Sequence, residues 1–307
     1  MVLLLGAGLF LRSLQSAGNI DLGFDIREGG VVWVMSMGND MTGEEFRIAA
    51  RTLEERARAL PGITEAGSAE IIPLGLGYQE GHFDIPGVTP PSGDDHLDIA
   101  YNIVSPTYLD VMGVPMVSGR GILATDRADS EPVAVVSETA ARRYWPGQDP
   151  IGQLIIRSGR EESYRVVGVA RDTKVWTLGE EHRPYIYIPH EQYGGEGLQL
   201  VARGNAPEAQ TVSQLRQLVS EVDPRLVVME AKTMSEHLAV ALFPPRMAAL
   251  LLGVFGALAL ILATTGLYGT VAYSVSRRGR EVGIRMSLGA DAGKVVWMVL
   301  KGALSLG

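Results

Sequence analysis

The chain has 307 residues, enough for one large or two ordinary domains, and a formal net charge of −8. It contains no cysteine, which excludes disulfide bonds, thiol catalysis and thiolate metal sites. Residues 13–246 hold 20 Lys and Arg against 33 Asp and Glu, whereas residues 277–294 carry five basic side chains against two acidic ones. The acidic stretch argues against nucleic-acid binding, which needs a basic face.

The first segment is apolar. Residues 1–11 carry no charge, but eleven residues are too few to span a bilayer, and no basic region precedes them as in a signal peptide. The segment 1–12 is therefore either an interfacial anchor or the end of a truncated membrane helix. Residues 292–307 begin another apolar helix and stop, which favours the second alternative. We expect a fragment cut inside two membrane helices.

Two stretches share the order strand, helix, strand. In the first, residues 31–37 predict a strand, and Thr42 and Glu45 have the spacing of a capping box that opens a helix. Pro61-Gly62 ends that helix, and residues 63–72 predict a second strand. The same order returns over residues 198–202, 205–222 and 226–229. We interpret the pair as one split α+β domain, by internal duplication or by chance similarity, with parts 30–73 and 197–232 separated by an insertion.

The insertion, residues 74–196, is richer in strands and turns. Gly77–Asp95 is rich in Gly and Pro and predicts a mobile loop. Strands are predicted at 101–104, 133–136, 164–170 and 185–188, and a short helix runs from a Ser137 cap to Tyr144. The group formed by Asp94, Asp95, His96 and Asp98 could bind a cation, but the favoured interpretation is a solvated acidic loop. The five histidines show no metal-ligand spacing.

A long uncharged run follows a short helix predicted at 233–241. Between Arg246 and Arg277 lie 30 uncharged residues. As a helix they would reach about 45 Å, against a hydrocarbon core of about 30 Å. We predict a transmembrane helix over 244–276, its start marked by Pro244 and Pro245; the alternative is a long core helix of a soluble protein. Basic residues after the span favour the cytoplasm, which places residues 13–243 outside.

Small residues recur at four-residue spacing along this run. Ala249, Gly253 and Ala257 form a stripe that would let another helix pack closely, although small residues are common in membrane helices.

No catalytic motif is present. Gly289–Lys294 has three residues between its glycines where a phosphate-binding loop needs four, and Val295 stands where Ser or Thr should bind magnesium. No serine lies in a Gly-x-Ser-x-Gly elbow. We predict no catalytic, cofactor or metal site, and a chain that is not itself an enzyme.

The cytoplasmic segment resembles a known family. Residues 280–290, REVGIRMSLGA, are similar to the loop after the second membrane helix in the MacB/FtsX superfamily of ABC transporter permeases. The outer stretch resembles the MacB-type periplasmic core domain over several motifs, as does the opening segment; they lie at residues 6–12, 101–108, 112–115, 118–120, 133–137, 144–147, 149–152 and 166–169. The resemblance covers nearly the whole chain and is closest to the variety without a fused ATPase.

The resemblance implies a βαβ-type porter part with a strand-rich inserted part, four membrane helices per subunit, dimerisation, and a partner ATPase that holds ATP and magnesium. It also implies that the segment 277–291 receives the motion of that ATPase. The coupling residues carried over are apolar (Val282, Ile284, Met286, Leu288), charged (Arg280, Glu281, Arg285) and glycine (Gly283, Gly289).

The expected function is that of a multi-pass permease subunit in the bacterial inner membrane, with residues 13–243 periplasmic. It would transmit ATP-driven motion mechanically to the periplasmic domain, for export or membrane extraction of a substrate. A periplasmic adaptor or an outer-membrane channel would be a further partner. Two alternatives stay open: an FtsX-like regulator of an extracytoplasmic enzyme that does not transport, and a membrane-anchored enzyme.

Overall fold

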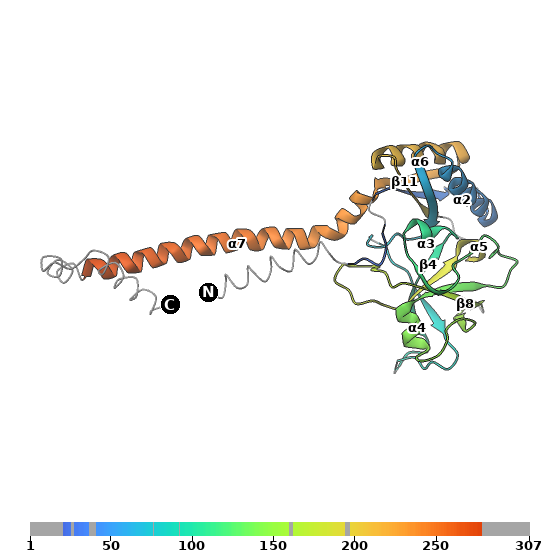
Figure 1. The fold of residues 1–307 in the computed structure, drawn as a ribbon, viewed down its shortest axis with the longest axis horizontal. Helices are drawn as coiled ribbons and strands as arrows, with labels where there is room; N and C mark the ends of the chain where they lie inside the picture. Colours follow the sequence, from blue (N-terminus) through green and yellow to red (C-terminus); the bar gives the residue numbers. More distant parts are fainter. Residues whose placement is uncertain are drawn as a thin grey trace. The chain divides into compact units, whose positions relative to one another are not determined.

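The computed structural model describes residues 21–25, 28–36, 41–75, 77–91, 93–159, 162–193 and 197–277 (Figure 1). The chain divides into two compact units. One spans Ile20–Phe243, and the described part of the other begins at Pro244. Strands dominate the first unit, and the described part of the second is helical.

Four strands of the first unit run antiparallel in the order β11-β1-β10-β2 at one end of an 11-stranded sheet, which continues from β2 into the insertion through the pairing of Ala69 with Val104. Their bounds are β1 Gly30–Ser36, β2 Ile63–Ala69, β10 Gly197–Gly204 and β11 Leu226–Thr233. Helix α2 (Gly43–Arg58) joins β1 to β2, and α6 (Glu208–Val222) joins β10 to β11. Both predicted strand–helix–strand units are thus confirmed. They interlock, because β10 lies between β1 and β2. We call these six elements the frame.

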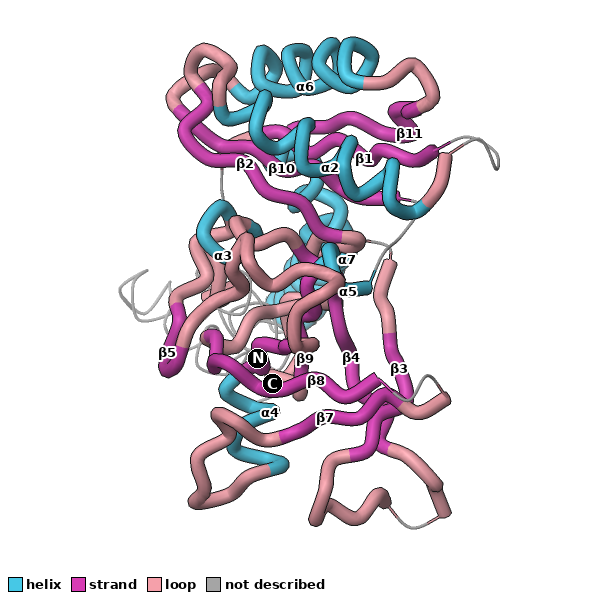
Figure 2. Tube along the Cα trace, turned by 90° about the vertical axis from the view of Figure 1, so that its right-hand side faces the viewer, coloured by secondary structure: helices cyan, strands magenta, loops and turns pink. Residues whose placement is uncertain are grey.

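Both helices of the frame cover the same face of its sheet (Figure 2). Strand residues alternate between the two faces, so that Val32 and Val34 contact the helices while Val31 points into a second cluster. Helix α2 turns Phe46, Leu53 and other residues at helical spacing toward the same cluster. Burial of this apolar stripe therefore holds each helix on the sheet.

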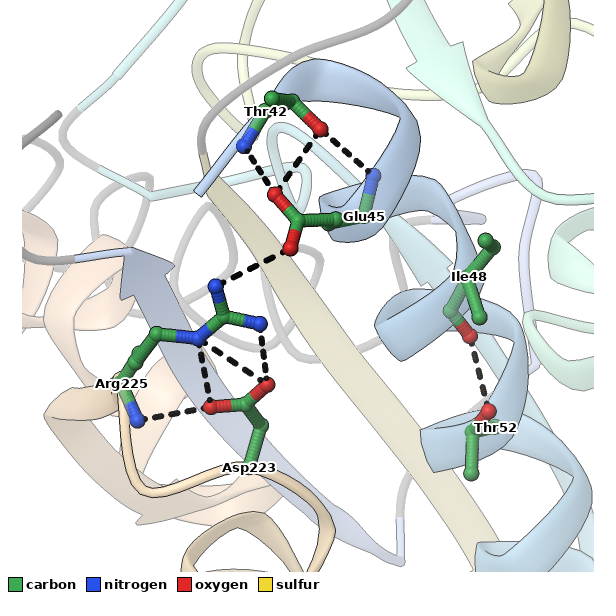
Figure 3. Close-up of polar contacts among 6 residues, drawn as sticks. All are labelled: Thr42, Glu45, Ile48, Thr52, Asp223 and Arg225. Carbon is green, nitrogen blue, oxygen red and sulfur yellow. Dashed lines mark hydrogen bonds and ion pairs between the residues drawn. The ribbon is translucent and has the colours of Figure 1, made fainter. Parts of the chain in front are cut away.

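The start of α2 is fixed by the predicted capping box (Figure 3). The Glu45 backbone N–H donates to Thr42 Oγ1 at 3.2 Å, and the Thr42 backbone N–H donates to Glu45 Oε2 at 2.8 Å. Arg225, just before β11, donates to Glu45 Oε1 at 3.2 Å and also to Asp223. The cap therefore also ties α2 to the turn between α6 and β11.

Replacing Thr42 with alanine should lower the free energy of unfolding of this unit by about 1 kcal/mol, because an orphan helix donor loses its acceptor. Urea unfolding followed by circular dichroism measures the change. Thr52→Ala is the matched control. Its hydroxyl donates to the Ile48 carbonyl at 2.8 Å in the interior of the same helix (Figure 3), a bond that adds little stability. Equal losses in the two variants would contradict a capping role for Thr42.

The insertion between β2 and β10 forms a closed barrel. Its strands follow the order β4-β3-β7-β8-β6-β9, and β9 pairs in parallel with β4 to close the ring. Strand β5 pairs with β8 outside this ring. The bounds are β3 Glu80–Asp84, β4 Leu97–Val104, β5 Met116–Gly119, β6 Val133–Ser137, β7 Leu154–Arg157, β8 Glu162–Ala170 and β9 Tyr185–Pro189. We call this part the inserted barrel.

Three short helices accompany the barrel: α3 (Tyr108–Val111), α4 (Glu138–Tyr144) and α5 (His190–Tyr193). The Ser137 side chain caps α4 as predicted, accepting from the Ala140 N–H. A separate apolar cluster that includes Phe83, Ile99 and Tyr164 fills the barrel. The two parts of the unit therefore have cores of their own.

Two predictions about local structure are wrong. Strand β3 lies within Gly77–Asp95, which was expected to be a mobile loop. Its pairing with β4 and β7 and the burial of Phe83 outweigh the Gly and Pro around it. The short helix expected at 233–241 is not separate either, since α7 runs from Met234 to Arg277 through both prolines. A proline removes one backbone donor and disfavours a helix without forbidding it.

Among the described residues, one helical segment, Leu250–Thr270, is long and apolar enough to cross a membrane, with a mean hydropathy of 2.3. Within the described part of the chain none of this segment is buried, which disagrees with the alternative of a soluble core helix. Such a surface requires lipid or another protein to cover it.

Candidate functional site at the start of the long helix

The predicted coupling residues lie outside the described residues; they are Arg280, Glu281, Val282, Gly283, Ile284, Arg285, Met286, Leu288 and Gly289. The predicted stripe of small residues lies on α7. There Gly253 and Ala257 are exposed, and a Cβ added to Gly253 would meet no described atom within 4 Å. The structure therefore describes one end of the predicted transmission route, namely the start of α7, which belongs to the Ile20–Phe243 unit.

Helix α7 begins where β11 ends, without an intervening loop. The Thr233 N–H donates to Glu236 Oε2 at 2.9 Å, and the Glu236 N–H donates to Thr233 Oγ1 at 3.0 Å. This is a second capping box, which the Thr-x-x-Glu spacing at residues 233–236 could have revealed. Strand and helix are thus joined by satisfied hydrogen bonds rather than by flexible backbone.

Glu208, the first residue of α6, ties the start of α7 to the frame. Its Oε1 accepts from the Gly29 N–H at 3.1 Å and from the Ser235 N–H at 3.2 Å. The Gly29 carbonyl in turn accepts from the Met234 N–H at 2.9 Å. A carboxylate near the N-termini of two helices also interacts favourably with both helix dipoles.

His237 ties the same helix to the segment that leaves β2 for the inserted barrel. Its side chain is buried, and its Nε2 donates to the Pro73 carbonyl at 2.7 Å. Burial lowers the pKa of His237, which favours the neutral ring. A Cβ on Gly75 would lie 3.2 Å from His237 Cε1, so the absence of a side chain lets this segment pass close to the ring.

The apolar contacts of this helix start reach both parts of the unit. Met234 is fully buried in a cluster that includes Val31 and Val201 of the frame. The same cluster includes Tyr108 and Tyr187, which belong to the insertion, and Leu238 packs against it. The first turns of α7 therefore form a joint in contact with the frame and the insertion together. We call residues 233–241 the helix root.

A second feature lies between the two parts, where α2 faces the insertion. Glu54 is buried and accepts a hydrogen bond from Ser68 Oγ at 2.5 Å, and burial raises its pKa to about 7. Burial, with a smaller contribution from Arg47, lowers the pKa of nearby His190 to about 4. Glu54, Ser105 and His190 line one cavity of about 170 Å³.

These buried groups were missed by the sequence reasoning. Glu54 has no motif around it, and its burial depends on chain segments that approach only in the folded state. Between about pH 4 and pH 7 Glu54 and His190 are both mainly neutral, so neither carries a buried charge in that range, whereas ionised Glu54 would carry a desolvation cost.

Two protein-family models match this chain, and their matches include residues that the structure does not describe. The family model of the MacB-like periplasmic core domain matches residues 9–221, and that of the FtsX-like permease C-terminal region matches residues 253–307. The macrolide export ATP-binding/permease protein MacB of Mannheimia succiniciproducens is 22% identical over 201 residues, covering 63% of this chain and 30% of that protein. MacB of Rhodospirillum rubrum is 27% identical over 201 residues, covering 62% and 30%. Each match thus spans less than a third of the relative.

Similar solved structures include the periplasmic region of MacB from Actinobacillus actinomycetemcomitans, with a TM-score of 0.44 and 14% identity over 68% of this chain and 90% of that one. The extracellular domain of the ABC-type transporter YknZ from Gram-positive bacteria has a TM-score of 0.42 and 14% identity, over 65% of this chain and all of the other.

Proposed function

The chain belongs to the family of the MacB-like periplasmic core domain, and we propose that it works as the permease component of an ABC-type transporter by mechanical transmission. In this proposal a separate cytoplasmic ATPase binds ATP and magnesium and drives the motion. A second permease copy completes the assembly in the inner membrane. Residues 13–243 lie outside the cytoplasm and residues 277–291 inside it.

Transmission is supported by the way the helix root is joined to the rest of the unit. No loop separates β11 from α7, so a displacement of the helix start is passed to the sheet instead of being absorbed by flexible backbone. Glu208 and His237 connect the same turns to α6 and to the segment that enters the insertion. A shift of α7 would thus act on the frame and the inserted barrel at once, as a two-state element biased by nucleotide requires.

The coupling segment is the other end of the proposed route. Glu281 and Arg285 stand at i and i+4, where a helix would pair them, and they are also available for charge pairs with the ATPase. The apolar residues between them, such as Ile284, would contribute the buried part of that contact.

Affinity purification of the full-length protein from native membranes, followed by mass spectrometry, tests the proposal. We expect an ABC ATPase in stoichiometric amount from the unmodified protein, and its loss from the Glu281→Ala/Arg285→Ala variant. The matched control is Glu131→Ala/Arg165→Ala, which removes an exposed charge pair with a 2.6 Å contact in the insertion.

Retention of the ATPase by the coupling variant, or its loss from both variants, would sink the proposed contact. Recovery of no ATPase with the unmodified protein would sink the permease proposal itself. A cell-wall hydrolase recovered together with the ATPase would favour the regulator over the transporter.

A further inference from the structure

Two His-x-Asp motifs lie side by side on the inserted barrel. Strand β3 carries His82-Phe83-Asp84, and His96 lies just before Leu97 and Asp98, the first two residues of β4. The antiparallel register pairs His82 with Asp98 and Phe83 with Leu97. One residue further along the two strands, the same register places Asp84 beside His96. The central Phe83 and Leu97 are buried in the barrel core, so the four polar residues share the outer face.

The four side chains form two imidazole–carboxylate pairs. His82 Nδ1 lies 2.7 Å from Asp98 Oδ1, and His96 Nδ1 lies 3.0 Å from Asp84 Oδ1. The two imidazole ring centroids are 6.0 Å apart. Ser158 Oγ donates to Asp84 Oδ2 at 2.8 Å and so holds that carboxylate from the end of β7.

This arrangement orients both rings in the way that metal-binding histidines are oriented. A carboxylate on one ring nitrogen fixes the tautomer and leaves the other nitrogen to bind the metal. Here both carboxylates engage Nδ1, and among the described residues neither Nε2 has a hydrogen-bond partner. Imidazole nitrogens are ligands for Zn²⁺ and Cu²⁺.

The ring spacing suits a shared ion. With metal–nitrogen bonds of about 2.0 Å, two imidazole centroids at a tetrahedral metal lie about 5.2 Å apart. From the observed 6.0 Å the rings would have to approach each other by about 1 Å and turn so that both Nε2 atoms face the ion. The side chain of His82 is 69% exposed and that of His96 is 42% exposed, so both have room to turn.

We propose that His82 and His96 bind one Zn²⁺ or Cu²⁺ ion through their Nε2 atoms, with Asp98 and Asp84 as positioning residues. In the part of the chain that the structure describes, no three His, Cys, Asp or Glu side chains are grouped to hold a metal. The chain therefore supplies two nitrogens, and water completes the coordination. The site is an open one on the barrel surface, separate from the helix root.

The test uses the purified, tag-free 307-residue chain in detergent micelles, titrated with Cu²⁺ alone and followed by electron paramagnetic resonance. We expect one bound Cu²⁺ per chain with coupling to two imidazole nitrogens, and displacement by excess Zn²⁺. His82→Ala and His96→Ala should each weaken binding at least tenfold, and Asp98→Asn should weaken it roughly tenfold, as the loss of an orienting carboxylate does. His182→Ala, which removes an exposed histidine elsewhere, should leave binding unchanged.

Two results would overturn the proposal. One is the absence of stoichiometric Cu²⁺ binding by the unmodified chain. The other is binding that survives both single histidine substitutions, which would place the ion elsewhere. Thermal unfolding of each variant without metal confirms that a lost signal reflects a lost ligand rather than a lost fold, and the exposure of both rings predicts unchanged melting.

Discussion

Replacing Glu54 with glutamine is expected to stabilise the folded Ile20–Phe243 unit above pH 7, by up to about 3 kcal/mol. Burial raises the pKa of Glu54 from its usual 4.5 to about 7. Because each pKa unit corresponds to about 1.4 kcal/mol, ionising this carboxyl in the folded state costs about 3 kcal/mol relative to the unfolded chain. Glutamine keeps the shape and a polar group for Ser68 but cannot ionise.

The sign of the pH dependence follows from proton binding. Between pH 4.5 and about 7 the folded state retains a proton that the unfolded state releases, so the contribution of Glu54 to stability falls as pH rises. Below pH 4.5 Glu54 is protonated in both the folded and the unfolded state. Above about pH 7 it is ionised in both, and the folded state carries the full cost of ionising a buried carboxyl. Urea unfolding across this range measures the slope for the original and Glu54→Gln chains.

The adjacent Glu55 provides the control, because it lies on the same helix but is exposed. Because its side chain is exposed, Glu55→Gln should not reproduce the stabilisation expected of Glu54→Gln above pH 7. Parallel pH curves for the original and Glu54→Gln chains would show that Glu54 is solvated in the folded state, contrary to its burial in the structure.

If the chain works as proposed, inserting three glycines after Ala241 will abolish ATP-driven motion of the outer part of the chain in the complex with the ATPase. The insertion leaves the cap at Thr233 and the His237–Pro73 hydrogen bond in place. It gives the helix a flexible break, because glycine is among the weakest helix formers. If the helix root transmits force, displacement of α7 will be taken up by the break.

The absence of cysteine makes this measurable with one label. A cysteine at Val117, which is 55% exposed on β5, would carry a single environment-sensitive dye. We expect its fluorescence to change on ATP addition to the complex with the ATPase, and the change to fall at least tenfold with the insertion. The same insertion after exposed Gly147 serves as control. An unchanged response with the Ala241 insertion would show that the motion reaches the domain by another route.

The sequence predicted the elements whose determinants lie close together in the chain, and it missed those that depend on distant residues. Helix α2 was predictable because its determinants are local: Thr42 and Glu45 are three residues apart, and Phe46 and Leu53 lie on one helical stripe. The two strand–helix–strand units were predictable for the same reason. Strand β3 was not, since Phe83 is its one fully buried side chain and its pairing partners lie elsewhere in the sequence.

The candidate sites depend on contacts that no local pattern encodes. Glu208 reaches Ser235 from 27 residues away, and His237 reaches Pro73 from 164 residues away. Likewise, the sequence reasoning grouped His96 with neighbouring aspartates and passed over His82, which only strand pairing brings beside it. The coupling residues were carried over from family resemblance and stay a prediction, outside the described part of the chain.

The interlocked order of the frame has a consequence for how the chain folds as it is made. Gly30 of β1 pairs with Ala202 of β10, which lies 172 residues later in the chain. At a synthesis rate of roughly 5–20 residues per second, β1 waits on the order of 10 to 30 s for β10. Meanwhile all strands of the inserted barrel ring have been made, and it can close on a core of its own. The sheet of the frame, from which the helix root continues, is therefore completed last. Its strands that still lack a partner are the segments most exposed to mispairing during biogenesis.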